Sequence, residues 1–199
     1  MRFFLLALCA EKDVATQNEL VSKALHCGDS LSDLFIALLD FSKLDAGDVS
    51  VNVSVFDITE LIDSLSEEFA LQAGDFQVKF EASSSSCLVQ SDATISKRIL
   101  RNLLSNAFKY SRGGRVELSC RLDSNFIVIE VIDTGIGIPK DQLDDVFKEF
   151  YQVGNVERDR SKGLGLGLAI VDRLSALLNI AIHMDSEPAK GTVVSFRLL

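Results

Sequence analysis

An aspartate at the end of a hydrophobic run is the first feature of the sequence that could do chemistry. Residues 126–132 are rich in β-branched side chains and predict a strand, and Asp133 follows them directly. Gly135, Gly137 and Pro139 come next, so the backbone must turn sharply there. We therefore expect one carboxylate at the mouth of a sheet, beside bare backbone N–H groups, where a ligand with hydrogen-bond donors or an anion can bind. An Asp-x-Gly at a strand end is, however, more often an ordinary turn.

A row of polar residues on a predicted helix is the second such feature. Asn102, Asn106 and Lys109 follow one another at i, i+4 and i+7, which places them on one helix face. Asparagine is a middling helix former, so two of them in register cost stability unless they have a role. An amide oxygen is a neutral ligand that suits Mg²⁺, which prefers oxygen. On these residues alone, a solvated helix face is the favoured alternative.

Alternating glycines that run into a predicted helix form the third feature. Gly163, Gly165 and Gly167 follow Lys162 and precede an apolar, helix-forming stretch. Such a segment exposes several N–H groups at the positive end of a helix, which predicts an anion site. It is not a Gly-x-x-x-x-Gly-Lys-Ser/Thr loop, and without a preceding strand the dinucleotide-binding pattern also fails. A flexible glycine-rich linker is the alternative.

The composition limits what these features can serve. The chain has 199 residues, 47% of them hydrophobic, which is enough for one good core and an appendage. A formal net charge of −9 argues against binding nucleic acid through the overall field, so any phosphate site must be made locally. The four cysteines form no Cys-x-x-Cys pair and there are two histidines. This argues against a disulfide framework, a zinc site and a histidine-rich metal centre.

The first part of the chain predicts a long helix over residues 13–45. Its apolar side chains follow one another at spacings of 4 and 3, a heptad seam made by Leu20, Ala24, Cys27, Leu31, Leu34, Leu38 and Phe41. Further apolar positions widen this stripe towards a helical bundle, with an ordinary amphipathic helix as the alternative. Gly47 suits a left-handed cap at the end. Residues 1–10 are too short to cross a bilayer, and predict the cut end of another helix or, less favoured, a signal peptide.

The rest of the chain alternates helices and strands irregularly. Residues 49–55 predict a short strand or an extended linker, and Asp57 caps a helix that Gly74 stops. Strands are expected at 76–82, 88–90, 116–122, 126–132, 180–185 and 192–198, and further helices at 92–110, 140–147 and 166–178. Residues 154–163 are too polar to pack. The pattern predicts an α+β fold with mostly antiparallel strands and helices layered on one sheet face.

Taken together, these motifs resemble the ATP-binding motifs of sensor histidine kinases. They occur in the expected order as Asn102-Leu-Leu-Ser-Asn106-Ala-Phe-Lys109-Tyr110-Ser111, Asp133-Thr-Gly135-Ile-Gly137-Ile-Pro, Phe147-Lys-Glu-Phe150 and Gly163-Leu-Gly165-Leu-Gly167-Leu-Ala-Ile. The resemblance implies a two-layer α/β sandwich of the histidine kinase, gyrase and chaperone type. Residues 39–47 resemble the end of the second dimerisation helix. The implied domains are an incomplete dimerisation hairpin at 1–47, a linker at 48–56 and an ATP-binding catalytic domain at 57–199.

The resemblance also implies a role for each site residue. Asp133 would accept a hydrogen bond from the adenine amino group, where guanine would place an unfavourable second acceptor. Asn106 would ligate Mg²⁺, while Asn102 and Lys109 would contact the phosphates as the catalytic side chains. Thr192 would support the adenine pocket. The other cofactor-binding residues would border the nucleotide or close over its phosphates: Tyr110, Gly135, Gly137, Ile138, Lys162, Gly163, Leu164, Gly165, Leu166, Gly167 and Leu168.

One position separates two branches of this fold. Relatives that hydrolyse ATP carry a glutamate four residues before the Mg²⁺ asparagine, and this chain has Asn102 there, which cannot serve as a general base. The resemblance therefore implies a protein histidine kinase, which transfers the γ-phosphoryl of ATP to a histidine and then to a response-regulator aspartate. The alternatives are an ATP-hydrolysing relative and a non-catalytic, dimerising module that docks a regulator.

The phosphoacceptor histidine of the family has no counterpart at the expected place. His26 falls on the second predicted dimerisation helix, and His183 lies in a late strand. We expect that the chain starts inside the first helix, after the reactive histidine, and so cannot autophosphorylate by itself. The implied partners are a response-regulator receiver domain and a second copy of the chain, without nucleic acid. The implied location is cytoplasmic, and a membrane would be involved through regions outside this chain.

Overall fold

The structure is a computed structural model that describes residues 20, 21, 28, 35, 38, 39, 41–153 and 164–199. Most of the helix predicted over 13–45, residues 1–10 and the polar segment 154–163 therefore lie outside the described residues. Residues 41–45 are helical and a turn follows, with Gly47 at φ +72°. The predicted left-handed end of this helix is thus confirmed.

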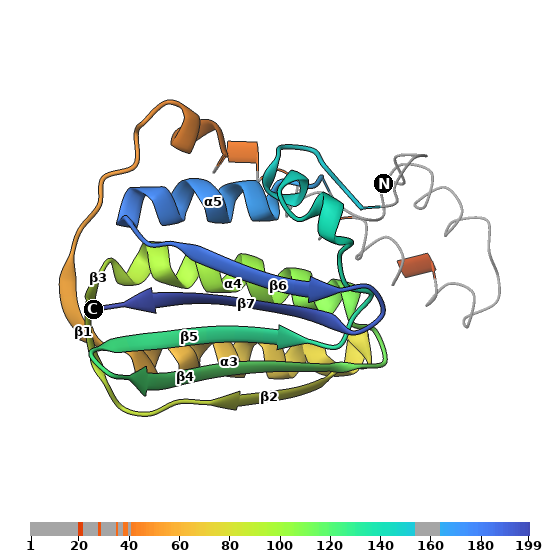
Figure 1. The fold of residues 1–199 in the computed structure, drawn as a ribbon, viewed down its shortest axis with the longest axis horizontal. Helices are drawn as coiled ribbons and strands as arrows, with labels where there is room; N and C mark the ends of the chain where they lie inside the picture. The colour runs from red at the N-terminus through yellow and green to blue at the C-terminus, as the bar shows by residue number, and fades with distance from the viewer. Residues whose placement is uncertain (1–19, 22–27, 29–34, 36–37, 40, 154–163) are drawn as a thin grey trace.

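A five-stranded sheet forms one layer of the described part of the chain, in the order β2-β4-β5-β7-β6 (Figure 1). Its strands are β2 (Lys79–Ser83), β4 (Arg115–Asp123), β5 (Phe126–Asp133), β6 (Ile182–Glu187) and β7 (Gly191–Leu198). β2 runs parallel to β4, and the other pairs are antiparallel. A separate antiparallel ladder joins β1 (Ser54–Asp57) to β3 (Leu88–Ser91). The predicted, mostly antiparallel strand arrangement is confirmed.

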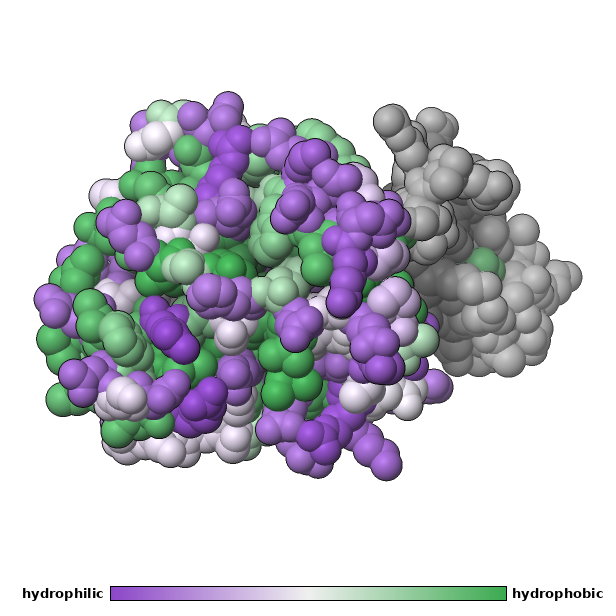
Figure 2. Space-filling view, viewed as in Figure 1, coloured by the Kyte–Doolittle hydropathy of each residue, from purple (hydrophilic) through white to green (hydrophobic). Residues whose placement is uncertain are grey.

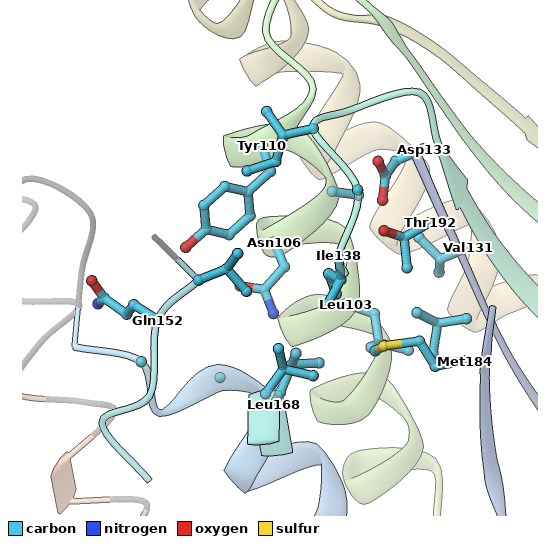
Figure 3. A pocket seen from close by; sticks show the side chains of 18 of the residues that line it. Leu103, Asn106, Tyr110, Val131, Asp133, Ile138, Gln152, Leu168, Met184 and Thr192 are labelled. Carbon is cyan, nitrogen blue, oxygen red and sulfur yellow. The ribbon is translucent and has the colours of Figure 1, made fainter. Parts of the chain in front are cut away.

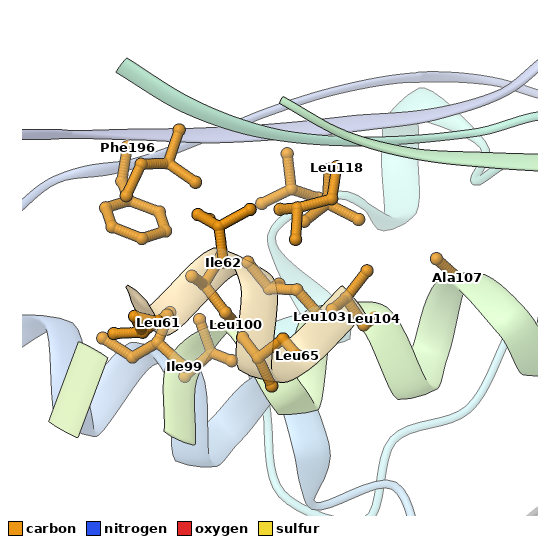
Figure 4. Close-up of a cluster of buried hydrophobic side chains, with 14 of the residues drawn as sticks. Leu61, Ile62, Leu65, Ile99, Leu100, Leu103, Leu104, Ala107, Leu118 and Phe196 are labelled. Carbon is orange, nitrogen blue, oxygen red and sulfur yellow. The ribbon is translucent and has the colours of Figure 1, made fainter. Parts of the chain in front are cut away.

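Helices α3 (Ile58–Phe76), α4 (Ala93–Tyr110) and α5 (Gly167–Leu178) form the second layer, on one face of the sheet (Figures 1 and 4). Asp57 caps α3 by accepting from Thr59 N, and Asp92 caps α4 by accepting from Ile95 N, both at 2.9 Å. Side-chain caps of this kind satisfy N–H groups that lack a helical partner. No helix in the described residues is both long enough and apolar enough to span a membrane.

Two of the predicted helix boundaries were wrong. The first predicted stop was Gly74, but α3 continues through this residue to Phe76, and Gln77 at φ +56° forms the left-handed end instead. A glycine inside a helix costs about 1 kcal/mol relative to alanine and does not by itself end the helix. The single helix predicted at 140–147 is two 3₁₀ turns, Lys140–Gln142 and Asp145–Phe147. Their i→i+3 bonds, Gln142 N to Pro139 O and Lys148 N to Asp145 O, close turns that are too short to continue as one α-helix.

The hydrophobic core lies between the helices and the sheet. Phe108 is 1% exposed, and its ring meets those of Phe69, Phe76 and Phe80 edge-on at centroid distances of 5.0, 6.0 and 5.3 Å. Edge-to-face pairs contribute about 0.5–1.5 kcal/mol each beyond the burial of apolar area. The helical period places further buried residues of α4 on the side of the helix that faces the core: Ile99, Leu100, Leu103, Leu104 and Ala107 (Figure 4). With these positions buried, the row of Asn102 and Asn106 is directed to the side of α4.

The other face of the sheet is partly polar. Glu117, Ser119 and Glu130 alternate along their strands with buried residues, so they point away from the helices. Figure 2 shows hydrophilic residues interspersed with hydrophobic ones on the side of the molecule that it presents. The sheet thus has one face packed against helices and one that carries polar side chains, as is common for antiparallel sheets.

Candidate functional site

A pocket of about 110 Å³ lies between the C-terminal half of α4, the first turn of α5 and the ends of β5, β6 and β7 (Figure 3). Its walls carry both apolar side chains and the predicted polar groups. The predicted residues that line it are Asn106, Tyr110, Asp133, Gly137, Ile138, Gly165, Gly167, Leu168 and Thr192. Residues from all three motifs therefore meet at one cavity.

Asp133 is the last residue of β5 and presents a half-buried carboxylate to this pocket (Figure 3). Its Oδ1 accepts a hydrogen bond from Gly135 N at 2.8 Å and another from Ser111 Oγ at 3.0 Å. Burial raises the pKa of the Asp133 carboxyl above its ordinary value, while the bonds from Gly135 and Ser111 act in the opposite direction. These hydrogen bonds thus fix the orientation of the carboxylate and offset part of the free-energy cost of burying its charge.

Thr192 and Ser186 continue a polar row from Asp133 across the sheet. Thr192 on β7 pairs in register with Asp133 and also with Ser186 on β6, and directly opposed residues share one face of a sheet. Thr192 and Ser186 are 9% and 4% exposed, so both hydroxyl groups are buried. Their oxygens lie 2.9 Å apart, and Ile138 N donates to Ser186 Oγ at 2.8 Å. The sheet side of the pocket is therefore a connected hydrogen-bond network.

The loop after Asp133 packs tightly against the turn between β6 and β7. Ala189 N donates to Ile136 O at 2.8 Å. Gly137 has φ +66°, and a Cβ built on it would overlap the Glu187 carbonyl. Gly191 has φ +108°, and a Cβ there would overlap the Asp133 carbonyl. Both positions need glycine for its conformation and for its lack of a side chain.

The helix side of the pocket brings the asparagine row against the start of α5. A Cβ on Gly167 would lie 3.3 Å from Asn106 Nδ2 and 3.5 Å from Asn102 Oδ1, which shows that these groups are neighbours. Asn102 Nδ2 donates to Arg98 O at 2.9 Å, which leaves its amide oxygen on the Gly167 side. Leu166 is the N-cap of α5, and a leucine side chain cannot accept from the first N–H groups of the helix. The start of α5 is consequently suited to an anion.

The other predicted residues lie at varying distances from the cavity. Tyr110 lines it and burial raises the pKa of its hydroxyl, while Lys109 Nζ lies 5.0 Å from the centre of the Tyr110 ring. The predicted residues that do not line the pocket are Asn102, Lys109, Gly135, Leu164 and Leu166. Lys162 and Gly163 lie outside the described residues.

Sequence reasoning missed much of the pocket lining. Ser111 and Ser186 hold the sheet side in place, and Tyr151 bonds to Gln142 Oε1 at 2.9 Å on the rim. The lining residues that were not predicted are Leu103, Ala107, Val131, Ile136, Val146, Tyr151, Gln152, Val153, Met184 and Val194. Most of these are apolar, and in a sequence they cannot be told from ordinary core residues. Ser111 was part of a recognised motif and could have been found from that position.

The size of the cavity limits what it can enclose. A volume of about 110 Å³ is well below the range of about 300–1,000 Å³ that is usual for whole-ligand sites. The enclosed part therefore suits one compact, mostly apolar group with hydrogen-bond donors on the edge that faces Asp133. The remainder of such a ligand must extend towards Asn106 and the start of α5, where an anionic group is favoured.

These features define a class of protein: two-layer α/β sandwiches that bind a nucleotide between the sheet and the start of a glycine-initiated helix. The chain belongs to the family of histidine kinase-, DNA gyrase B-, and HSP90-like ATPases, whose sequence pattern matches residues 91–199. The predicted fold and the resemblance to sensor histidine kinases are thereby confirmed. Within the family, relatives that match this chain along most of its length include sensor kinases.

Two relatives show the extent of this similarity. The sensor histidine kinase RcsC of Salmonella typhimurium is 29% identical over 202 residues, which cover 97% of this chain and 21% of RcsC. The aerobic respiration control sensor protein ArcB of Escherichia coli is 30% identical over 194 residues, which cover 94% of this chain and 25% of ArcB. The chain therefore spans between a fifth and a quarter of the length of these curated relatives.

Solved structures agree with the fold. Full-length ShkA in complex with AMPPNP is 29% identical, with a TM-score of 0.75 over 96% of this chain and 40% of that chain. The mycobacterial sensor histidine kinase MprB is also 29% identical, with a TM-score of 0.62 over 74% of this chain and 97% of that chain. The histidine kinase AdeS of Acinetobacter baumannii, 22% identical with a TM-score of 0.74, supports the fold alone. The described chain thus carries the catalytic-domain fold of histidine kinases.

Proposed function

We propose that this chain is the catalytic core of a two-component sensor histidine kinase, which binds ATP with Mg²⁺ and transfers the γ-phosphoryl group to a histidine. The observation that carries this proposal is the meeting of Asp133, Asn106 and Gly167 at one cavity. These residues come from the three separate motifs, and each suits a different part of one nucleotide. A similar solved chain, full-length ShkA, is a complex with the ATP analogue AMPPNP.

Adenine fits the sheet side of the pocket. Its flat, mostly apolar ring suits a small cavity with walls such as Leu103, Val131 and Met184. Its amino group can donate to the Asp133 carboxylate, a charge-assisted bond that is stronger than a bond between neutral groups. In the proposed pose, Tyr110 borders the ring, and Gly137 allows the loop to approach it closely.

The phosphates fit the helix side. Asn106 supplies an amide oxygen for Mg²⁺, an ion that usually takes few protein ligands and shares the phosphates and water with them. Among the described residues, no group of three or more His, Cys, Asp and Glu side chains could hold a metal. When bound, Mg²⁺ would neutralise charge on the phosphates. Lys109, Asn102 and the N–H groups at the start of α5 would orient the phosphate chain.

Transfer is favoured over hydrolysis by the chemistry of Asn102. Hydrolysis needs a group that can take a proton from water, and an amide cannot do so at neutral pH. In the structure the amide nitrogen of Asn102 donates to Arg98 O, and its oxygen faces the Gly167 side. Such a side chain can position a phosphate but cannot activate water. We therefore propose phosphoryl transfer to a protein side chain as the reaction.

The acceptor would be a histidine on a dimerisation helix, and the phosphoryl group would pass from it to a response-regulator aspartate. His183 alternates along β6 with Met184 and Ser186, so its side chain is on the opposite face of the sheet from the pocket. His26 lies outside the described residues. We further propose the division into a hairpin at 1–47, a linker at 48–56 and a catalytic domain at 57–199, with the hairpin forming a homodimer.

Binding and transfer can be tested separately. A fluorescent ATP analogue should bind with an affinity that increases when Mg²⁺ is added, and no binding would identify a non-catalytic module. Incubation with labelled ATP and a separate histidine-bearing hairpin should label the hairpin. Rapid release of phosphate without the hairpin would show that the chain is instead an ATP-hydrolysing enzyme.

A further inference from the structure

Ser186 is a buried polar residue to which neither the motifs nor the proposed reaction assigns a role. It lies on β6 opposite Thr192, which lines the pocket. Its hydroxyl oxygen is within hydrogen-bond distance of three atoms: Ile138 N at 2.8 Å, the Gly191 carbonyl oxygen at 2.9 Å and Thr192 Oγ1 at 2.9 Å. A hydroxyl with three neighbours of different kinds has little freedom in how it bonds.

These three contacts fix the direction of each hydrogen bond. A serine hydroxyl has one proton to donate and two lone pairs with which to accept. The Ile138 amide can only donate, so it takes one lone pair, and the Gly191 carbonyl can only accept, so it takes the Ser186 proton. One lone pair is left, and it faces Thr192 Oγ1. With the Ser186 proton on the Gly191 carbonyl, Thr192 is the donor in the bond between the two hydroxyls.

The direction of that bond decides what Thr192 offers to a ligand. Its one proton points to Ser186, so its oxygen presents lone pairs to the pocket. Its register partner on β5, Asp133, presents a carboxylate, whose Oδ1 accepts from Gly135 N and Ser111 Oγ. The side chains of Asp133 and Thr192 together therefore present acceptors to the pocket at this edge.

We infer that Ser186 is a specificity-determining residue that acts through Thr192 and makes this edge select a 6-amino purine against a 6-oxo purine. The inference rests on the proposed nucleotide function and names what selects the base. An amino group has two N–H bonds to offer to two acceptors. A carbonyl oxygen at the same place would face the lone pairs of both residues with no proton between them, and buried polar groups without a partner are costly.

Ser186 also ties the loop 133–139 to β6, so a purely structural role must be distinguished from base selection. Loss of the bond from Ile138 N would loosen the loop and lower the affinity for all nucleotides to the same degree. Loss of the bond that sets the direction of the Thr192 hydroxyl would instead change the preference between bases, because the threonine proton could then turn towards the ligand. The ratio of two affinities separates these effects, whereas a single affinity does not.

The test compares the dissociation constants of ADP and IDP in the full chain and its variants. The two bases differ in the amino or oxo group at the 6-position and in the proton that the 6-oxo base carries on N1. Wild type should prefer ADP. In Ser186→Ala the preference should fall about tenfold, because a hydrogen bond to a buried group is worth roughly 1 kcal/mol or more and 1.4 kcal/mol is tenfold in affinity. Ser186→Thr keeps the hydroxyl and should restore the preference.

Ser96→Ala is the matched control. Ser96 is 0% exposed, bonds through its hydroxyl to Ser91 Oγ at 3.2 Å and does not line the pocket, so the same chemical change there should leave the ratio unaltered. If Ser186→Ala bound both nucleotides with an unchanged ratio of dissociation constants, the inference would be overturned and the proposed function would stand. The same holds if both affinities fell equally.

A wild-type chain that binds neither ADP nor IDP would overturn the proposed function together with base selection. The bonding of Ser186 can still be tested in that case, by amide hydrogen exchange of the ligand-free protein. The Ile138 amide should exchange faster in Ser186→Ala than in wild type or Ser96→Ala. Equal exchange rates would show that the hydrogen bond assigned to Ser186 does not hold this loop.

Discussion

The two sides of the pocket are held in place by different kinds of interaction. On the sheet side, Asp133, Thr192 and Ser186 are positioned by the strand ladders, and their side chains are fixed by buried hydrogen bonds. On the helix side, Asn102, Asn106 and Gly167 are positioned by the packing of α4 against α5, and Asn102 is further held by a single hydrogen bond from its Nδ2 to Arg98 O. We call these two groups the sheet-side wall and the helix-side wall.

This difference suits the two ends of the proposed ligand. A base is recognised by a fixed pattern of donors and acceptors, so a rigid wall binds it with little loss of conformational freedom. A phosphate chain with Mg²⁺ carries water and changes during transfer, so it needs groups that can adjust. We therefore expect changes in the sheet-side wall to affect stability and base preference, and changes in the helix-side wall to affect mainly the dependence on Mg²⁺.

The largest effect is expected for Gly191→Ala, in the sheet-side wall. The new Cβ would overlap the Asp133 carbonyl, and φ +108° is a conformation that alanine rarely adopts. Strain and overpacking should together lower the free energy of unfolding by about 2–4 kcal/mol and abolish nucleotide binding. Chemical denaturation and a binding assay measure the two effects.

Gly74→Ala is the matched control for this substitution. It lies inside α3 with nothing within 4 Å of the added Cβ. Alanine is favoured over glycine in a helix interior by about 0.5–1 kcal/mol, so this variant should be slightly stabilised and should bind nucleotide normally. If both variants were equally stable, the sheet-side wall would not be the rigid element that the structure indicates.

The second largest effect is expected for Asp133→Asn. The amide oxygen of asparagine can accept from Gly135 N and Ser111 Oγ as Oδ1 does, so its NH₂ group would turn towards the ligand. A donor would then face the adenine amino group, and affinity for ATP should fall by about 1.5–3 kcal/mol. Titration with a fluorescent ATP analogue measures this, and unchanged affinity would refute the adenine assignment.

The same variant should change how stability depends on pH. Burial raises the pKa of the Asp133 carboxyl in the folded chain, so the folded state binds this proton more tightly than the unfolded state does. The contribution to stability is therefore fully present below the unfolded value, near 3.8, and is lost as the pH rises through the folded value. Relative to wild type, Asp133→Asn should be more stable at pH 7, and the advantage should shrink on acidification. Denaturation curves across this range would show the opposite trend if folding favoured the ionised carboxylate and so lowered its pKa.

The sequence predicted the parts of the site that depend on short-range patterns. Asp133 follows a β-branched run, Asn102 and Asn106 share a helical spacing, and Gly167 begins an apolar helix, so each could be found within a few residues of sequence. The left-handed turn at Gly47 was predictable for the same reason. Local chemistry decides such features, and their identity does not depend on which strands pair.

The parts that were missed depend on strand register. Ser186, which was missed, lies opposite the predicted Thr192 only because β6 pairs with β7, and the predicted Asp133 joins the row because β7 also pairs with β5. A single sequence contains no signal for that register. The end of α3 was missed for a different reason, since Gly74 and Gln77 could each have provided the left-handed cap and the tertiary packing selects Gln77.

A smaller effect is expected for Asn106→Ala, in the helix-side wall. Removal of its amide oxygen should weaken binding of ATP in the presence of Mg²⁺ by about tenfold, or 1.4 kcal/mol, and leave binding without the metal nearly unchanged. Ser105→Ala, at an exposed neighbouring position on α4, is the control. The preference for ADP over IDP should be the same in all three proteins. A change in base preference would contradict the division between the two walls.

The smallest effect is expected for Arg173→Ala, on α5, the helix whose first residue is Gly167 of the helix-side wall. The Arg173 guanidinium on α5 bonds to Glu149 at 2.6 Å and to Asp45 at 2.8 Å, and lies 4.3 Å from the centre of the Phe41 ring. Its partners are 40% and 67% exposed. Exposed ion pairs contribute about 1 kcal/mol or less and are screened by salt, so loss of Arg173 should lower stability only slightly.

Salt dependence distinguishes the exposed ion pairs of Arg173 from the buried hydrogen bonds of the sheet-side wall. In wild type, amide exchange over residues 146–153, which carry Glu149, should become faster as salt is added, whereas exchange at Ile138 should stay the same because its hydrogen bond to Ser186 is buried. Arg173→Ala should show the faster exchange already at low salt, and Arg173→Lys should be intermediate because it keeps the charge but loses the planar fork. Equal salt sensitivity at both places would mean that the ion pairs of Arg173 and the buried bond of Ser186 are not screened differently by salt.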